Sequence, residues 1–155
     1  MATIEQQIER YLNALSDAID KTMVVDVADL AKGAISDAAK TEVYGKYTPR
    51  FYSRRGPHLG GIMDEQTMIT KYDGSNRLEK RLVISSEAGF QHLWGGHYPD
   101  ENLSDVIERG DGRFYMGIAG PRPYHDAAKE TLIKSGLLDS ALEDGVEREL
   151  HGRKF

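Results

Sequence analysis

The chain divides at one stretch, Tyr44-Gly45-Lys46-Tyr47-Thr48-Pro49-Arg50-Phe51-Tyr52, which Ser53-Arg54-Arg55-Gly56 follow. Its first nine residues hold four of the 13 aromatic residues (8 Tyr, 4 Phe and 1 Trp). From Lys46 to Ile62 there are four Lys/Arg and no Asp or Glu, although the net charge of the chain is −5. Tyr and Arg concentrate binding energy at interfaces, so the stretch indicates an interface. An equally weighted alternative is that Tyr44, Tyr47 and Phe51 anchor a helix end to the core while the arginines face solvent.

Residues 3–45, before this stretch, carry apolar side chains three and four apart, which predicts a long N-terminal helix. The apolar stripe consists of Ile4, Ile8, Leu12, Leu15, Ile19, Met23, Val27, Leu30, Ala34 and Ala38. A continuous helix of this size would be on the order of 60 Å long, so it either breaks or reaches a neighbour. Low helix propensity marks two break points, Val24-Val25-Asp26 and Gly33, and we favour Val24. Gly45, in a left-handed conformation, and Pro49 are expected to end the helix.

The residues after the stretch alternate between strand and turn signals. A hairpin is predicted from residues 67–72 and 77–86, because the turn residues 73–76 separate two β-favouring runs. Residues 90–99 read as a glycine-containing aromatic segment that leads into a short helix over 103–109. Residues 114–119 read as a strand or an extended segment.

Two helices are predicted at the C-terminal end. Gly120-Pro121-Arg122-Pro123 introduces a helix over residues 124–135, which Gly136 stops. Leu138, Leu142, Val146 and Leu150 then recur four apart, which is typical of an amphipathic helix. Such a stripe favours packing on its own domain over packing on a partner.

The expected fold is therefore α+β: the long N-terminal helix, a small antiparallel sheet, and C-terminal helices packed on one face. A chain of 155 residues is of single-domain size. We expect one domain over residues 1–155, with 1–45 helical, 46–63 an aromatic-basic loop, 64–120 β-rich with a short helix, and 121–155 the C-terminal helices.

Composition excludes several classes of function. The chain has no cysteine, which excludes disulfides, thiolate metal sites and cysteine nucleophiles. No long apolar run and no signal-peptide pattern is present, so a soluble protein without membrane contact is expected. A pI near 5.5 argues against a general nucleic-acid binder, since such domains need excess positive charge.

The sequence contains no recognisable active site. His92 and His97, with Asp100 and Glu101 nearby, match no established metal-ligand spacing. The glycine-rich segments lack both phosphate-loop and dinucleotide patterns, and no serine lies in a nucleophile elbow. We expect no catalytic residues, no metal and no cofactor.

Three motifs in order resemble a known family. They are residues 43–56, then Gly60-Gly61-Ile62-Met63-Asp64, then Gly120-Pro121-Arg122-Pro123-Tyr124 before a C-terminal helix. This order resembles the head-tail joining, or tail-completion, morphogenesis proteins of tailed bacteriophages. In that family a Tyr-x-Pro-x-x-Tyr-x-Arg-Arg run precedes a Gly-Gly-Leu-x-Asp segment, and an Arg-Pro-Phe element introduces a closing helix.

The match covers most of the chain. Tyr47, Pro49, Tyr52, Arg54 and Arg55 fit the first motif. Ile62 and Met63 take apolar places in the second motif, and Tyr124 replaces the phenylalanine of the third. The region beyond Gly136 is longer than the resemblance implies, which leaves a specific docking helix open.

The resemblance implies a structural role in the virion neck, assembled in the host cytoplasm. The chain would be one subunit of a ring of six copies that joins the head connector or stopper to the tail terminator or tail tube, with DNA only passing through. A ring needs two different patches on each subunit that fit head to tail. The predicted interface residues are Tyr44, Tyr47, Pro49, Arg50, Phe51, Tyr52, Arg54, Arg55, Trp94, Pro121, Arg122, Pro123 and Tyr124.

Two other functions compete with this interpretation. The runner-up is a nucleic-acid-binding accessory protein that uses the aromatic and basic residues of Tyr47–Arg55 for stacking and phosphate contact. A small metal-dependent hydrolase at His92 and His97 ranks last.

Overall fold

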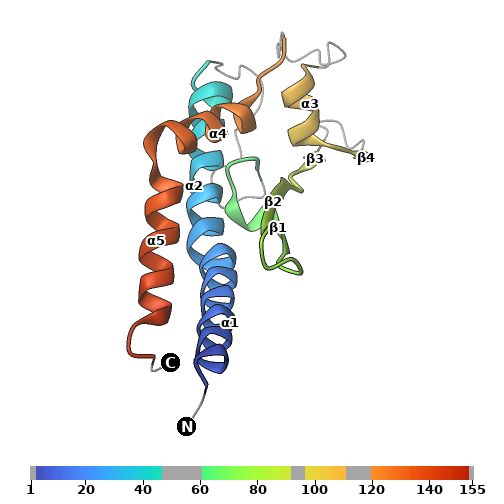
Figure 1. Ribbon diagram of the computed structural model, residues 1–155. Coiled ribbons are helices and arrows are strands. Elements are labelled where there is room, and N and C mark those ends of the chain that lie inside the picture. The colour runs from blue at the N-terminus through green and yellow to red at the C-terminus, as the bar shows by residue number, and fades with distance from the viewer. Residues whose placement is uncertain (1–2, 47–60, 92–96, 111–119, 154–155) are drawn as a thin grey trace. The chain divides into compact units, whose positions relative to one another are not determined.

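The structure of the protein is a computed structural model, which describes residues 3–46, 61–91, 97–110 and 120–153 (Figure 1). The predicted α+β class is confirmed, with a long N-terminal helix, paired antiparallel strands and C-terminal helices. The elements are α1 (Ile4–Thr22), a π-helical turn (Met23–Val27), α2 (Ala28–Ala38), a second π-helical turn (Ala39–Tyr44), a 3₁₀ turn (Glu65–Thr67), β1 (Met68–Asp73), β2 (Arg81–Ser86), β3 (Gly89–Gln91), β4 (His97–Asn102), α3 (Leu103–Arg109), α4 (Tyr124–Ser135) and α5 (Leu137–Leu150).

The chain forms two compact units. Unit 1 is drawn from residues 1–30, 70–83 and 135–155, and unit 2 from residues 31–69 and 84–134. The turn end of the β1–β2 hairpin belongs to unit 1, and the outer ends of its two strands belong to unit 2. That residues 1–155 are a single domain stays a prediction.

The N-terminal helix begins with a capping box. The Gln6 amide donates to Thr3 Oγ1 over 3.2 Å, and the Gln6 side chain accepts from the Thr3 amide over 3.0 Å. At the expected break near Val24 the backbone stays helical, since Met23 and Ala28, at the two ends of the π-helical turn, both keep right-handed helical dihedrals. The hydrogen-bond pattern therefore changes where a weak point was predicted, but the helix is not interrupted there.

The end of the N-terminal helix differs from the expectation. Gly45 follows the last helical residue, Tyr44, but its φ of −69° is right-handed, so the predicted left-handed conformation is wrong. Its amide instead donates to the Lys40 carbonyl oxygen over 2.8 Å, five residues back. A Cβ at Gly45 would lie 2.7 Å from the Thr41 carbonyl oxygen, so this helix end requires glycine for space rather than for a positive φ.

Unit 1 contains an antiparallel pair of helices. In Figure 1, α1 and α5 run side by side in opposite directions. The two helices approach each other closely at Gly145, where an added Cβ would lie 2.2 Å from Thr22 Cγ2. Ala18 and Thr22 are fully buried on the α1 side of this contact. Small residues at the crossing therefore allow the two backbones to come close.

Unit 2 has the larger apolar core. Tyr124 and Ile62 are its largest fully buried hydrophobic side chains. The core residues are Ile35, Ala39, Val43, Ile62, Met68, Ala88, Ile107, Tyr124 and Ala128. They come from α2 and the following π-helical turn, the start of β1, the segments just before the 3₁₀ turn and just after β2, α3 and α4, so this core joins segments that are distant in the sequence.

Most predicted elements of the second half are confirmed. The hairpin forms, and α3 and α4 have the predicted bounds. Gly136 adopts the left-handed φ of 68° between α4 and α5. The short antiparallel pairing of β3 with β4 was not predicted, because residues 90–99 carry too many glycines for a strand pattern. The predicted extended segment over residues 114–119 lies outside the described residues.

Candidate interaction surface

The predicted interface residues are only partly described. Eight of them lie outside the described residues: Tyr47, Pro49, Arg50, Phe51, Tyr52, Arg54, Arg55 and Trp94. The other five, Tyr44, Pro121, Arg122, Pro123 and Tyr124, all belong to unit 2. Whether these residues bind a partner stays a prediction.

The structure brings the described parts of the three motifs together in unit 2. Arg122 Nη1 donates to the Val43 carbonyl oxygen over 3.0 Å, so a cation lies at the C-terminal end of the N-terminal helix, where it is electrostatically favoured. Tyr44 packs against the core. Ile62, from the second motif, is fully buried in the same core, and Ser36 Oγ donates to the Met63 carbonyl oxygen over 2.8 Å. Tyr44 therefore anchors the end of the N-terminal helix to the core, which is the alternative to an interface role that the sequence left open.

Tyr124 is a core residue in this conformation. Its ring has no exposed surface, and its hydroxyl oxygen lies 2.6 Å from Ser104 Oγ. Burial raises the pKa of the Tyr124 hydroxyl to about 12, because the charged form is disfavoured away from water. Pro121 and Pro123, on either side of Arg122, are exposed. A partner would thus meet the prolines of this motif rather than the Tyr124 ring.

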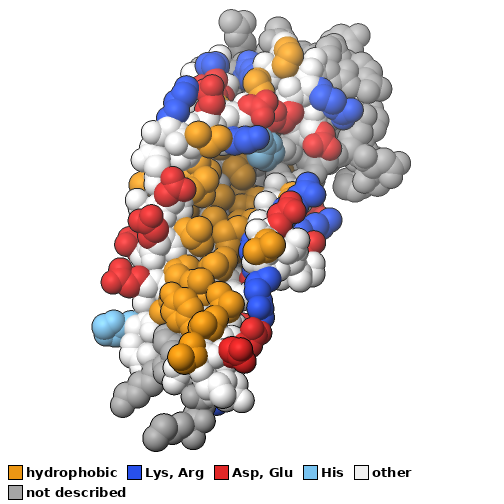
Figure 2. Space-filling model, in the orientation of Figure 1, with side chains coloured by type: hydrophobic (Ala, Val, Ile, Leu, Met, Phe, Trp, Pro, Cys, Tyr) orange, Lys and Arg blue, Asp and Glu red, His pale blue; other side chains and the backbone are white. Residues whose placement is uncertain are grey.

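Unit 1 has an apolar surface that the sequence analysis did not single out. Ile4 is 75% exposed and Ile8 is 54% exposed, and Tyr11 and Leu12 are also exposed, although all four lie on the apolar side of α1. Figure 2 shows hydrophobic side chains gathered over α1 and α5. Contiguous exposed apolar surface of this kind marks interaction sites in soluble proteins.

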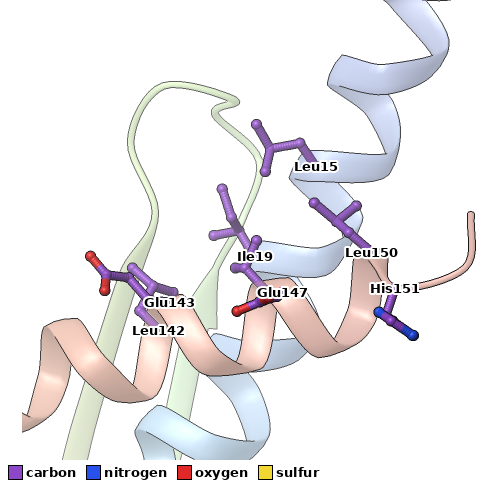
Figure 3. Close-up of a pocket in the computed structure, with 8 residues that line it drawn as sticks. Leu15, Ile19, Leu142, Glu143, Glu147, Leu150 and His151 are labelled. Carbon is purple, nitrogen blue, oxygen red and sulfur yellow. The ribbon is translucent and has the colours of Figure 1, made fainter.

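This apolar surface continues into a groove between α1 and α5, here called the α1–α5 groove. Leu15 and Ile19 of α1 face Leu142 and Leu150 of α5 (Figure 3). The groove has a volume of about 600 Å³, and Val146, Glu143, Glu147 and His151 complete its lining. The two carboxylates stand one helical turn apart on α5, and both residues are exposed. The groove is therefore apolar inside and acidic along one edge.

Polar contacts fasten the hairpin loop to α1 in unit 1. Lys80 Nζ lies 2.6 Å from Asp20 Oδ1 and donates to Ser16 Oγ over 3.1 Å. Tyr72 Oη donates to the same Asp20 oxygen over 2.5 Å. Arg77 also contacts α1, where it pairs with Glu9 over 3.2 Å. Because Arg77 and Lys80 both contact α1, β2 starts at Arg81 and not at Arg77 as predicted.

The Asp20 contacts shift two pKa values. Burial alone would raise the pKa of the Asp20 carboxyl, but hydrogen bonds from Lys80 and Tyr72 outweigh it, and the pKa lies below its usual value of 3.8. For Tyr72, burial and the hydrogen bond to Asp20 both raise the pKa. Ionised Asp20 is therefore the form that the folded state stabilises.

We expect Asp20→Asn to destabilise the protein at neutral pH by about 1–2 kcal/mol, because a charge-assisted contact becomes a neutral one. A depressed carboxyl pKa stabilises the folded state above the unfolded pKa, and this contribution is lost as the pH falls through the lower, folded pKa. The difference between Asp20→Asn and the unchanged chain should therefore shrink below about pH 4. Urea unfolding at pH 7 and pH 3 measures it.

The matched control is Asp17→Asn, an exposed position on the same helix. It should change the free energy of unfolding by no more than about 0.5 kcal/mol at either pH. Equal effects of the two substitutions at pH 7 would show that the Asp20 contacts do not fasten the hairpin loop.

Among the residues that the structure describes, neither a metal-binding group nor a membrane-spanning helix is found. Within residues 3–46, 61–91, 97–110 and 120–153, no three His, Asp or Glu side chains gather as a metal-binding group would require. His92 lies outside these ranges, and only the backbone of His97 is described. Of the helices that the structure describes, none is both long and apolar enough to span a membrane.

Comparison with known proteins identifies the family. No curated protein and no solved structure matches the chain. The family model YomN matches residues 5–148, which is most of the chain and covers most of α1 and α5. The chain therefore belongs to the YomN family, which is phage-derived.

Proposed function

We propose that the protein is a non-enzymatic structural component of the phage particle that joins the head connector to the tail as a subunit of a ring. The observation that carries this proposal is the apolar surface of α1, with Ile4 and Ile8 more than half exposed in a chain of a phage-derived family. Leaving such surface in water costs free energy that association would recover. A binding role accounts for this surface better than a catalytic one.

The motifs support the same role. The described parts of the three segments that resemble head-tail joining proteins meet in unit 2, where Arg122 donates to the Val43 carbonyl oxygen and Ile62 and Tyr124 share one core. The first motif continues directly from this point into the aromatic-basic stretch. Unit 1 carries the α1–α5 groove, so each subunit has two chemically different candidate patches, as a head-to-tail ring requires. The partners we propose are other copies of the chain, the head connector or stopper, and the tail terminator or tail tube.

The test is to make phage particles without the chain. A stop codon at Tyr11 in the phage genome, grown with and without a suppressor host, gives matched preparations. Without suppression we expect electron micrographs with DNA-filled or emptied heads and free tails in place of joined particles. Joined, infectious particles in the absence of the chain would contradict the proposal.

A further inference from the structure

We propose that the α1–α5 groove binds the aromatic-basic segment, residues 46–55, of a second copy of the chain. The inference rests on the proposed self-association and names the surfaces that meet. The groove is in unit 1 and is lined by described residues. Of the segment, only Lys46 is described, where it pairs with Glu42 of the N-terminal helix, and residues 47–55 are considered by their sequence alone.

The groove sets two requirements for its occupant. Leu15, Ile19, Leu142 and Leu150 present apolar surface (Figure 3), so the occupant must bring apolar or aromatic side chains. Glu143 and Glu147 line the same groove and are exposed. Within the described residues neither carboxylate has an ion-pair partner, so the occupant must also bring positive charge.

The segment from Lys46 to Arg55 meets both requirements. It contains Tyr47, Phe51 and Tyr52 together with Lys46, Arg50, Arg54 and Arg55, and it has no Asp or Glu. Tyr and Arg are the residue types that contribute most at interface centres. Arginine can also pair with a carboxylate through two parallel hydrogen bonds, which favours this segment over a lysine-only one.

The chemistry favours a second copy over other occupants. An acidic edge repels phosphate, so the groove is a poor site for DNA. A patch and its complement carried on the same chain produce a head-to-tail contact that repeats from subunit to subunit, and such a contact closes into a ring when the rotation allows. The groove and the segment would thus be the two patches of one repeating contact.

Charge reversal tests this pairing in the full-length chain. One variant carries Glu143→Lys plus Glu147→Lys, and the other carries Arg54→Glu plus Arg55→Glu. Each variant alone places like charges across the contact, and we expect self-association to weaken by roughly a hundredfold, as measured by sedimentation velocity. An equimolar mixture of the two should associate again, because each groove then meets a segment of opposite charge.

A control variant with Asp37→Lys plus Asp144→Lys has the same charge change as the groove variant, at exposed helical positions that do not line the groove. It should associate like the unchanged chain. Circular dichroism of each variant checks that the helices are intact.

Three results would overturn the inference. If each charge-reversed variant associates like the unchanged chain, the contact lies elsewhere. If the mixture stays monomeric while the unchanged chain associates, the segment occupies its own groove or binds another protein. If the unchanged chain is monomeric throughout, the groove does not bind a second copy. The comparison of phage particles made with and without the chain tests the proposed function separately from these three results.

Discussion

Tyr124→Ala is expected to lower the free energy of unfolding by about 3–5 kcal/mol, the largest stability effect that we predict. The Tyr124 ring is fully buried and packs in the unit 2 core with Val43, Ile62 and Ile107. Removing the ring leaves a cavity at the place where α4 meets the residues around it, and the close packing of a core prevents full collapse. Urea unfolding, followed by circular dichroism, measures the loss.

Two control variants show whether the loss of stability comes from the buried ring, from the hydroxyl, or from replacing a tyrosine at any position. Tyr124→Phe keeps the ring and removes only the hydroxyl, which hydrogen-bonds with Ser104 and Ser86, so it should cost about 0.5–1.5 kcal/mol. Tyr11→Ala removes a ring that is 43% exposed and should cost less than about 1 kcal/mol. Similar losses for Tyr124→Ala and Tyr11→Ala would refute the placement of Tyr124 in the core.

Gly145→Ala is expected to destabilise the protein by about 1–3 kcal/mol, even though alanine favours helix more than glycine does. The new Cβ would lie 2.2 Å from Thr22 Cγ2 and 3.0 Å from Thr22 Cβ, so α1 and α5 would have to move apart. Thr22 has little freedom to give way, because it is fully buried and its hydroxyl donates to the Ala18 carbonyl oxygen over 2.9 Å. Thermal unfolding of the variant measures the effect.

Gly33→Ala is the matched control for this substitution. Gly33 also lies inside a helix, α2, but a Cβ there would meet nothing within 4 Å. Alanine should therefore stabilise the protein by about 0.5–1 kcal/mol, because it restricts the unfolded chain and favours helix. Opposite signs for Gly145→Ala and Gly33→Ala are predicted, and a stabilising Gly145→Ala would contradict the close approach of α1 and α5.

Local features of the fold could be predicted from the sequence. The starts and ends of α3 and α4 agree with the prediction, and for α4 the local signals are the Pro121-Arg122-Pro123 corner before it and Gly136 after it. The stripe along residues 3–45 likewise identifies one long helix. The behaviour near Val24 could not be predicted to the same detail, since a π-helical turn and a break both follow from low helix propensity.

The α1–α5 groove could not be found in this way. The stripe of Leu138, Leu142, Val146 and Leu150 indicates an amphipathic helix, and packing on its own domain was expected. In the structure α5 does pack on α1. The apolar side chains of the two helices are only partly covered by this packing, and those that remain open to solvent line the groove. The groove is formed by two helices that lie far apart in the sequence and approach each other closely at Gly145 and Thr22, and no local pattern reveals such a contact.

The most direct test of the central claim is the number of copies of this chain in purified phage particles, determined by quantitative mass spectrometry against a known head protein. An assembling subunit of a ring should be present at a small, constant copy number in every preparation of joined particles. A chain that is absent from the particles and remains a monomer in the infected cell would contradict the account.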